Sequence, residues 1–221
     1  MPGTKVPEEE RREQIIAAAC AVAAREGLDG TTILQVAAEA NVSPGLVIFH
    51  FKTKRGLLLA LVKWLVATTT VLQIDADVSA IASPHARLVA VLRQEMVRLS
   101  REPLRIRLMF DYFTAGIRDA DVRETMRVEF DRYRDAFRPI TTSVLLAEPE
   151  RFRGVTPEGL AAVSVSFIKG CAVQSMLDPD FDIDQYLAAA EGLMAQFDPT
   201  AAQQERRVPR ASAQESYAAI R

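Results

Sequence analysis

The stretch that decides the fold is residues 31–58, which read TTILQVAAEANVSPGLVIFHFKTKRGLL. Near its start, Thr32 is followed three residues later by Gln35, which is a capping-box pattern. In such a box, the two side chains satisfy backbone N–H groups that a helix start leaves without partners. Apolar residues then recur at helical spacing, so a short helix is predicted over 33–40.

The second part of this stretch predicts another short helix after a tight turn. Asn41 tolerates the left-handed backbone that such a turn needs. Ser43 can cap the next helix and Pro44 suits its first position, so a helix is predicted over 44–51. Two short helices joined by a tight turn are typical of a helix-turn-helix, whose second helix enters a major groove of DNA.

The neighbouring segments predict longer helices that would support this pair. Residues 9–26 carry apolar side chains at helical spacing, and Gly27 is well placed to end that helix. Thr53 can cap a fourth helix over 54–74, which would be about 30 Å long at 1.5 Å per residue. A helix of that length is a natural lever between a DNA-binding unit and the rest of the chain.

The rest of the chain is rich in helix formers and shows no sustained strand alternation. We therefore predict an all-α protein with nine or ten helices, of which a short final helix around residue 215 would be the last. The five helices expected after the fourth cover 84–101, 103–115, 119–146, 157–177 and 182–197.

The composition is that of an ordinary globular protein. Of 221 residues, 49% are hydrophobic and 25% are charged, which excludes a wholly disordered chain. Two cysteines, Cys20 and Cys171, cannot build a disulfide scaffold, and we expect both as buried free thiols in a reducing compartment. Residues 1–13 lack the apolar core of a signal peptide. Lys63 interrupts the apolar run 56–74, which favours a buried helix over a membrane span. We therefore expect a cytoplasmic protein with no membrane partner.

The positive charge that nucleic acid would need is local, because the formal net charge is −2. No acidic residue lies between Glu39 and Asp75. A face without carboxylates beside a helix start suits a phosphate group. A short basic run can also be a solvated turn, but here it coincides with the two capped helices, which favours DNA binding. The basic residues in this stretch are His50, Lys52, Lys54, Arg55 and Lys63.

Residues 12–61 resemble the DNA-binding domain of the TetR family of bacterial transcriptional regulators. This resemblance implies a dimeric, all-helical repressor whose larger C-terminal domain binds a small molecule. It also implies that 43–51 is the recognition helix, that Lys54 contacts phosphate and that His50 contacts the DNA backbone. The matching positions are Ile15, Ile16, Ala19, Gly27, Thr31, Thr32, Val36, Ala37, Asn41, Val42, Ser43, Gly45, His50, Phe51, Lys54, Leu57 and Leu58.

The expected domains are three. Residues 8–54 form the helix-turn-helix DNA-binding domain, residues 55–198 form the effector-binding and dimerisation domain, and residues 199–221 form a flexible tail or short final helix.

One position departs from the family pattern. Many members carry Tyr where this chain has Ile48, and Ile cannot form a hydrogen bond through its side chain. We therefore expect base reading through thymine methyl groups, through Thr32 and Gln35, or through DNA shape. Val47 is expected to face the core. The expected DNA contacts are Thr32, Gln35, Ser43, Pro44, Gly45, Leu46, Ile48, Phe49, His50, Lys52 and Lys54.

A second resemblance lies in the C-terminal half. Residues 167–170 (FIKG), with Gln174 and 177–179 (LDP), resemble the ending of the BetI-like branch of the same family. The founding members of that branch control choline and betaine genes. The branch is broad, so this resemblance leaves the ligand open.

Methionine and aromatic side chains gather on the predicted middle helices. Such a stripe is usual in a plain core, and it also suits an apolar ligand cavity with few polar groups. Asp111, Tyr112, Tyr133 and Gln174 are candidates for those polar groups, and aromatic faces with an acid would suit a quaternary ammonium. The effector-binding residues expected on this basis are Trp64, Met109, Phe110, Phe113, Met126, Phe130, Tyr133, Phe137 and Gln174.

The helices over 157–177 and 182–197 are rich in Ala, Ser and Gly, which allow close helix approach. In the family that the chain resembles, the last two core helices form a four-helix bundle with the partner subunit. A homodimer is therefore expected, and ordinary packing within one chain is the alternative.

No catalytic residue, cofactor or metal site is predicted. His50 and His85 lie far apart, and the alternating aspartates of 178–184 fail the glycine and glutamate positions of a calcium loop. There is no nucleophile elbow or phosphate loop. We therefore predict a non-enzyme: a repressor that a small-molecule effector releases from a palindromic operator on double-stranded DNA.

Two alternatives stay open. The first is a helical small-molecule-binding protein or enzyme with a vestigial DNA-binding domain, which the apolar character of 44–51 would support. The second is an interfacial membrane protein that uses 56–74.

Overall fold

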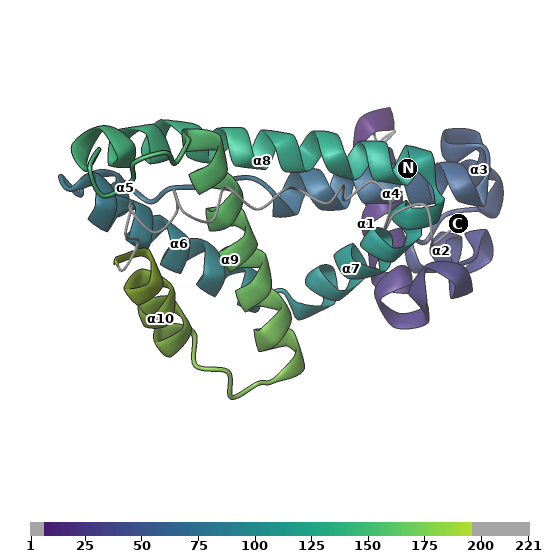
Figure 1. Cartoon of the computed structure of the whole chain (residues 1–221). Helices are drawn as coiled ribbons and strands as arrows, with labels where there is room; N and C mark the ends of the chain where they lie inside the picture. The colour runs from purple at the N-terminus through teal and green to yellow at the C-terminus, as the bar shows by residue number, and fades with distance from the viewer. Residues whose placement is uncertain (1–6, 196–221) are drawn as a thin grey trace.

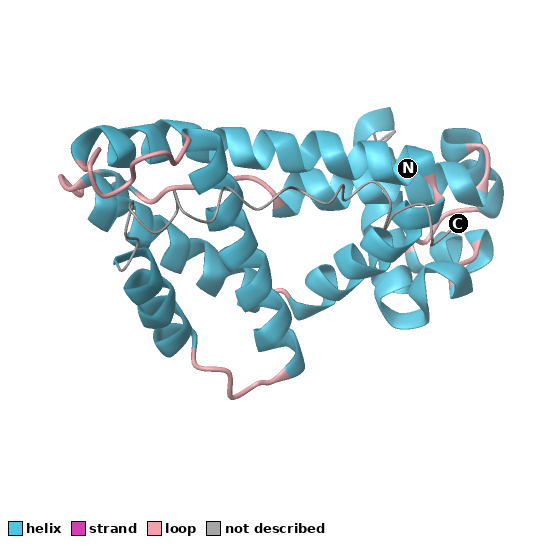
Figure 2. Ribbon diagram, viewed as in Figure 1, coloured by secondary structure: helices cyan, strands magenta, loops and turns pink. Residues whose placement is uncertain are grey.

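The computed structural model describes residues 7–195, which form ten α-helices and no strand (Figures 1 and 2). The predicted all-α fold is confirmed for this range. The expected tail and the final helix around residue 215 lie outside the described residues. In chain order the helices are α1 (Glu8–Gly30), α2 (Ile33–Glu39), α3 (Pro44–Phe51), α4 (Lys54–Thr69), α5 (Ala76–Ser79), α6 (Pro84–Ser100), α7 (Pro103–Arg118), α8 (Ala120–Ala147), α9 (Pro157–Leu177) and α10 (Ile183–Ala195).

Local hydrogen bonds fix α2 and α3 as the sequence predicts. Thr32 Oγ1 accepts a hydrogen bond from the N–H of Gln35, while Gln35 Oε1 accepts one from the N–H of Thr32. Ser43 Oγ accepts a hydrogen bond from the N–H of Leu46 at 3.2 Å. Asn41 has φ 52° in the intervening turn. The start of each short helix is therefore set by its own cap.

Helix α1 supports this pair from the protein interior. Its Ile15 is fully buried in a cluster that also contains Val36 of α2 and Val47 of α3. Gly27 has φ 75°, so the regular helix breaks there as expected, although one further turn continues to Gly30. Helix α3 is thus held against a buried, well-packed neighbour.

The corner between α3 and α4 requires glycine at position 56. A Cβ there would lie 2.2 Å from the backbone oxygen of Phe51. Replacing Gly56 by Ala should therefore lower the free energy of unfolding by about 1–3 kcal/mol through overpacking. Urea unfolding followed by circular dichroism measures this change. The matched control is Gly45→Ala, where the nearest atom to the new Cβ is 3.9 Å away; equal losses at both positions would contradict the explanation.

Helix α4 is shorter than predicted, because it ends at Thr69 rather than at residue 74 and is about 24 Å long. The hydroxyls of Thr69 and Thr70 donate hydrogen bonds to carbonyls one turn earlier. Arg98 donates to the carbonyls of Thr69 and Val71. The carbonyl of Thr69, the last residue of the helix, is thereby satisfied by a side chain from α6, so the helix can stop there. The short helix α5 that follows was not predicted.

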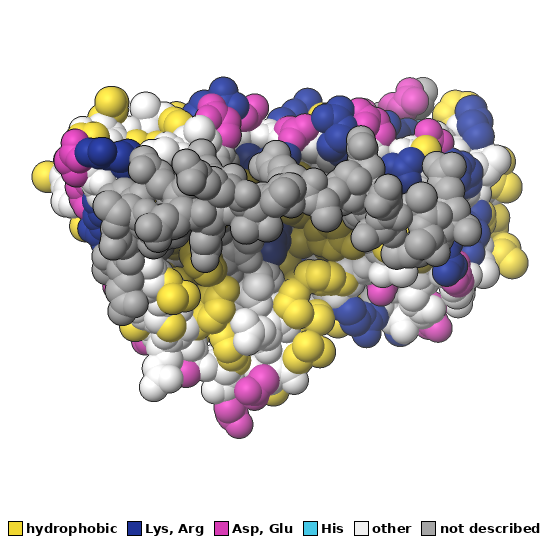
Figure 3. Space-filling view, in the orientation of Figure 1, with side chains coloured by type: hydrophobic (Ala, Val, Ile, Leu, Met, Phe, Trp, Pro, Cys, Tyr) yellow, Lys and Arg dark blue, Asp and Glu magenta, His cyan; other side chains and the backbone are white. Residues whose placement is uncertain are grey.

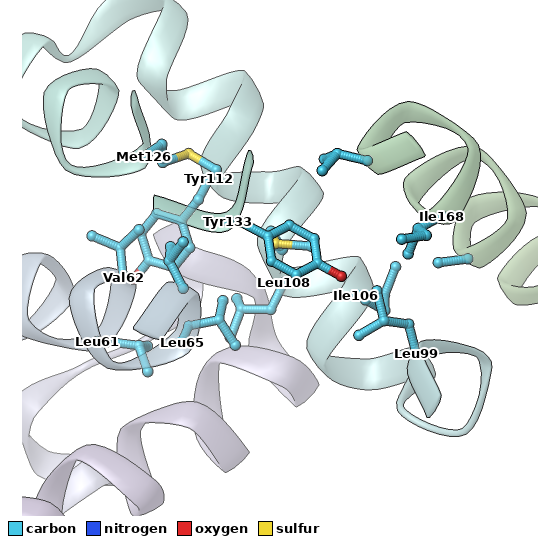
Figure 4. Packing of buried hydrophobic residues seen from close by; sticks show 14 of the residues in the cluster. Leu61, Val62, Leu65, Leu99, Ile106, Leu108, Tyr112, Met126, Tyr133 and Ile168 are labelled. Carbon is cyan, nitrogen blue, oxygen red and sulfur yellow. The ribbon is translucent and has the colours of Figure 1, made fainter. Parts of the chain in front are cut away.

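The larger domain is arranged around α8, which runs the length of the molecule beside α4 (Figure 1). Helix α7 extends three residues beyond its predicted end and leads back to α1, and α9 packs against α6, α7 and α8. Their buried side chains meet in one core (Figure 4). Members of this core include Leu61, Leu65, Leu99, Ile106, Leu108, Tyr112, Tyr133 and Ile168.

Within residues 7–195, α9 is the one helix that is long and apolar enough to cross a membrane by length and composition. Leu160, Ile168 and Cys171 of this helix are buried against its neighbours. The Cys171 thiol is free and buried as expected, whereas Cys20 is free but only half-buried.

Candidate nucleic-acid interface and ligand site

Helix α3 presents an apolar outer face. The exposed fractions of Ile48 and Phe49 are 49% and 61%, while Val47, on the opposite face of α3, is fully buried, as expected. Large side chains that are left exposed on a rigid, capped helix are suited to contact with thymine methyl groups.

Two lysines lie beside this face, just after α3. Lys52 has φ 66°, and its ammonium lies 5.2 Å from the centroid of the Phe49 ring. Lys54 Nζ donates a hydrogen bond to the carbonyl oxygen of Asp29 at 2.7 Å. Neither ammonium forms an ion pair in the part of the chain that the structure describes. Both charges can therefore serve phosphate oxygens.

The other residues expected to contact DNA surround the start of α3. Ser43, Pro44 and Gly45 are exposed, and Leu46 and His50 are half-buried. The carbonyl oxygen of His50 accepts a hydrogen bond from Arg12 of α1 at 3.4 Å.

Helix α2 contributes an exposed apolar residue that sequence reasoning missed. Thr32 is exposed, but the side-chain amide oxygen of Gln35, Oε1, already accepts hydrogen bonds from the N–H and the hydroxyl of Thr32. Leu34, which lies between them, is 69% exposed. Its position off the apolar face formed by Ile33, Val36 and Ala37 was the signal that could have identified it.

The expected effector residues divide into three groups. Four are buried in the core, four are half-buried, and Gln174 is exposed. The half-buried group includes a row in which the Phe110, Phe113 and Phe130 ring centroids are each 5.3 Å from the next. The buried group is Met109, Met126, Tyr133 and Phe137, and the fourth half-buried residue is Trp64, stacked under Arg105.

A buried polar cluster lies beside this aromatic row, and the sequence did not identify its members as a site. The fully buried Glu95 carboxylate accepts a hydrogen bond from the Tyr133 hydroxyl at 2.6 Å and forms an ion pair with Arg98 at 2.7 Å. Burial and the Glu95 carboxylate raise the pKa of Tyr133, which keeps its hydroxyl protonated. We call Glu95, Arg98, Tyr133 and Lys169 the inner polar cluster.

Lys169 is the fourth member of the inner polar cluster and is only 8% exposed. Its Nζ lies 5.6 Å from the Phe130 ring centroid and 5.4 Å from that of Tyr133. Burial, assisted by the Arg98 charge, lowers the pKa of Lys169 to about 8. A lysine in the apolar run VSVSFIKGCAV was the available sequence signal.

A second set of contacts joins the first half of α4 to α7 and α8. Arg55, at the start of α4, forms ion pairs with Asp119 and Asp121 at the start of α8. The hydrogen bond from Arg55 lowers the pKa of Asp119. The Tyr112 hydroxyl donates to the carbonyl oxygen of Leu58 at 2.8 Å.

These contacts border a cavity of about 350 Å³ whose lining includes Leu28, Lys54, Arg55 and Tyr112. Two further cavities, of about 580 and 360 Å³, have charged side chains in walls formed mainly by α6 and by α8, respectively. None of the three is lined by any of the nine expected effector-binding residues, although Tyr112, a candidate polar group, lines the first.

Two family models match the chain. Residues 15–61 match the model described as bacterial regulatory proteins of the TetR family. Residues 84–199 match the model described as the C-terminal domain of BetI-type transcriptional repressors.

Curated relatives match over part of their length. Over 84 residues, the chain is 37% identical to the HTH-type transcriptional regulator BetI of Paraburkholderia phymatum, which covers 38% of this chain and 43% of that protein. Over 80 residues, it is 40% identical to the HTH-type transcriptional regulator HbdR of Aromatoleum sp., and this match covers 36% of this chain and 34% of that protein. The chain therefore spans less than half the length of these relatives.

Solved structures match over most of the chain. A protein described as a transcriptional regulator from Pseudomonas aeruginosa PAO1 matches with a TM-score of 0.72 and 22% identity, over 87% of this chain and 94% of that one. Another from Saccharomonospora viridis, solved in complex with choline, matches with a TM-score of 0.63 and 20% identity, over 86% and 97%. At these identities the likeness confirms the fold alone.

Proposed function

The chain belongs to the TetR family of bacterial regulatory proteins and carries a BetI-type C-terminal domain, and on this premise we propose that it is a transcriptional repressor. In this proposal, a homodimer binds a palindromic operator in the cytoplasm, and a small molecule releases it. The larger domain binds that molecule and performs no catalysis.

The observation that carries this proposal is the outer face of α3. A short helix that is capped at Ser43, packed through Val47 and exposed at Ile48 and Phe49 has the shape and rigidity to enter a major groove. Lys52 and Lys54, whose ammonium groups donate to the carbonyls of Phe49 and Asp29 beside this face, are the proposed phosphate contacts.

The homodimer is proposed to form through α9 and α10. Val163 and Leu177 of α9 and Leu193 of α10 are large apolar side chains with exposed fractions of 46%, 75% and 66%. Pairing these surfaces around a two-fold axis would bury them. Binding to two half-sites then requires the two copies of α3 to lie about 34–36 Å apart, which is one turn of DNA.

Release by an effector is proposed to act through the start of α4. Lys54 is the proposed phosphate contact and donates to the Asp29 carbonyl oxygen of α1, whereas its neighbour Arg55 is paired with the start of α8. A shift of α8 on ligand binding would therefore move the anchor of α4 and change the spacing of the two recognition helices. The choline complex of the Saccharomonospora viridis regulator supports a small-molecule effector in this fold.

Selection of genomic DNA fragments by the purified protein in moderate salt, followed by sequencing, tests the proposal. We expect enrichment of a short inverted repeat. Folded, dimeric protein that enriches no sequence would overturn the repressor and favour a ligand-binding protein with a vestigial DNA-binding domain.

Lys54→Ala should weaken binding to every DNA sequence to a similar extent. Each lost phosphate contact removes about 0.9 from the slope of log K against log salt concentration, so a dimer should lose about 2. Fluorescence anisotropy between 50 and 300 mM salt, which is roughly the range where such slopes are measured, gives both slopes. Lys63→Ala, at an exposed position further along α4, is the control and should leave the slope unchanged; an unchanged slope for Lys54→Ala would contradict the assignment.

A further inference from the structure

Lys169 is a buried ammonium without an oxygen partner among the residues that the structure describes. Its recorded hydrogen-bond acceptor within residues 7–195 is the Met109 thioether sulfur, at 3.9 Å. A lysine ammonium has three donors, and a sulfur at that distance is a weak acceptor for one of them. Lysine is almost never buried to this extent unless it is paired.

The inner polar cluster also has an unbalanced charge. The Glu95 carboxylate is matched by the Arg98 guanidinium and the Tyr133 hydroxyl. The Lys169 ammonium is a second cation, so one carboxylate against two cations leaves the cluster at +1. A buried net charge is costly, and an incoming anion would remove that cost.

A row of aromatic rings extends from this cluster to half-buried positions. Phe110, Phe113 and Phe130 form a continuous row of half-buried rings, and Phe130 is also the ring beside Lys169 Nζ. Figure 3 shows hydrophobic side chains gathered in a hollow of the surface between α7 and α9. Half-buried aromatic rings that lead to a cation suit a molecule with an apolar body and an anionic end.

The same contacts disfavour a cationic ligand. A quaternary ammonium is recognised by aromatic faces, and here the faces of Phe130 and Tyr133 are already occupied by the Lys169 ammonium. A second cation would meet like charge from both Lys169 and Arg98 in a site of low dielectric. The expectation that aromatic faces would serve a quaternary ammonium is therefore not supported by the residues that surround them.

We propose that the effector is an apolar carboxylate, whose carboxylate group binds Lys169 and whose body lies along Phe130, Phe113 and Phe110. This inference rests on the proposed function, because it names the ligand class of the same regulatory domain.

Calorimetric titration of the full chain with matched ligands tests this proposal. Octanoate and 4-phenylbutyrate are the anionic probes, 1-octanol and 4-phenylbutanol are the neutral ones, and octyltrimethylammonium is the cationic one. A charge-assisted hydrogen bond predicts that each carboxylate binds about 10- to 100-fold more tightly than its alcohol. The cation should bind most weakly.

Three variants locate the effect. Lys169→Met should abolish the preference for carboxylate over alcohol, while Lys169→Arg should keep it. Lys63→Met removes an exposed lysine and should change nothing. A carboxylate preference that survives in Lys169→Met, equal or tighter binding of the cation, or no binding by either carboxylate would overturn the proposal.

The pH dependence provides a second readout. The groups that face Lys169 are Glu95 and Arg98 from α6 and Tyr133 from α8. Because the ammonium must be charged to bind the anion, octanoate affinity should fall as the pH rises past the Lys169 pKa, and Lys169→Arg should remove this fall. The titrations contain no DNA, so their failure leaves DNA binding to be judged by fragment selection.

Discussion

Replacing Glu95 by Met should lower the free energy of unfolding by about 3–5 kcal/mol, which is the usual loss when one partner of a buried ion pair is removed. The Glu95 side chain is fully buried, and the Arg98 side chain is 23% exposed. Without the carboxylate, Arg98 and the Tyr133 hydroxyl lose their shared acceptor, and three groups of the inner polar cluster remain with a net charge of +2. Urea unfolding at pH 7 and one fixed protein concentration measures the loss.

Glu124→Met provides the matched control for this prediction. Glu124 forms an ion pair with Arg127 on the surface of α8, and the two side chains are 61% and 58% exposed. Exposed pairs of this kind contribute about 0–1 kcal/mol. If Glu95→Met cost no more than Glu124→Met, the inner polar cluster would not be a stabilising unit.

Lys169→Met should have the opposite effect to Glu95→Met and raise the free energy of unfolding at pH 7 by roughly 3 kcal/mol. The pKa of Lys169 falls from its usual 10.5 to about 8 in the folded protein, and each unit corresponds to about 1.4 kcal/mol. At pH 7 Lys169 is charged in both the folded and the unfolded protein, so folding of the wild-type chain carries the full cost of burying that charge. Methionine has a similar length and no charge.

The advantage of Lys169→Met should disappear as the pH rises. Between pH 8 and 10.5, the unfolded chain holds a proton on Lys169 that the folded chain has released, so the stability of the wild type increases with pH. The difference in free energy of unfolding between Lys169→Met and the wild type should therefore be largest below pH 8 and vanish towards pH 10.5. Urea unfolding at pH 7 and pH 10 measures it, with Lys63→Met as the exposed control; a destabilised Lys169→Met at pH 7 would show that the ammonium already has a stabilising partner.

The sequence predicted the parts of the fold that local chemistry determines. The capping box of α2, the N-cap of α3 and the turn between them depend on residues close in sequence, such as Thr32 with Gln35 and Ser43 with Leu46. The predicted length of α4 was wrong because its end depends on Arg98, which lies far along the chain and donates to the carbonyls of Thr69 and Val71.

The candidate ligand site was less predictable for the same reason. A stripe of Met and aromatic residues has the same periodicity whether it fills a core or lines a pocket. The sequence therefore could not show that Met109 is buried in the core while Phe110 is only half-buried. The pairing of Glu95 with Tyr133, and the approach of Lys169 to that pair, join residues from three helices. Only the packing of α6, α8 and α9 brings these residues together.

The ion pairs of Arg55 have a consequence for chimeric regulators. Anyone who grafts the recognition unit of this chain onto another regulatory body must choose a crossover point, and the peptide bond between Lys54 and Arg55 is the natural one. A crossover after Arg55 would carry the guanidinium away from Asp119 and Asp121 and leave a hybrid that reads the donor operator without a bridge to the recipient's α8. A crossover before Arg55, or transplantation of both aspartates together with Arg55, keeps the ion pairs that couple the ligand-binding domain to the DNA-binding helices.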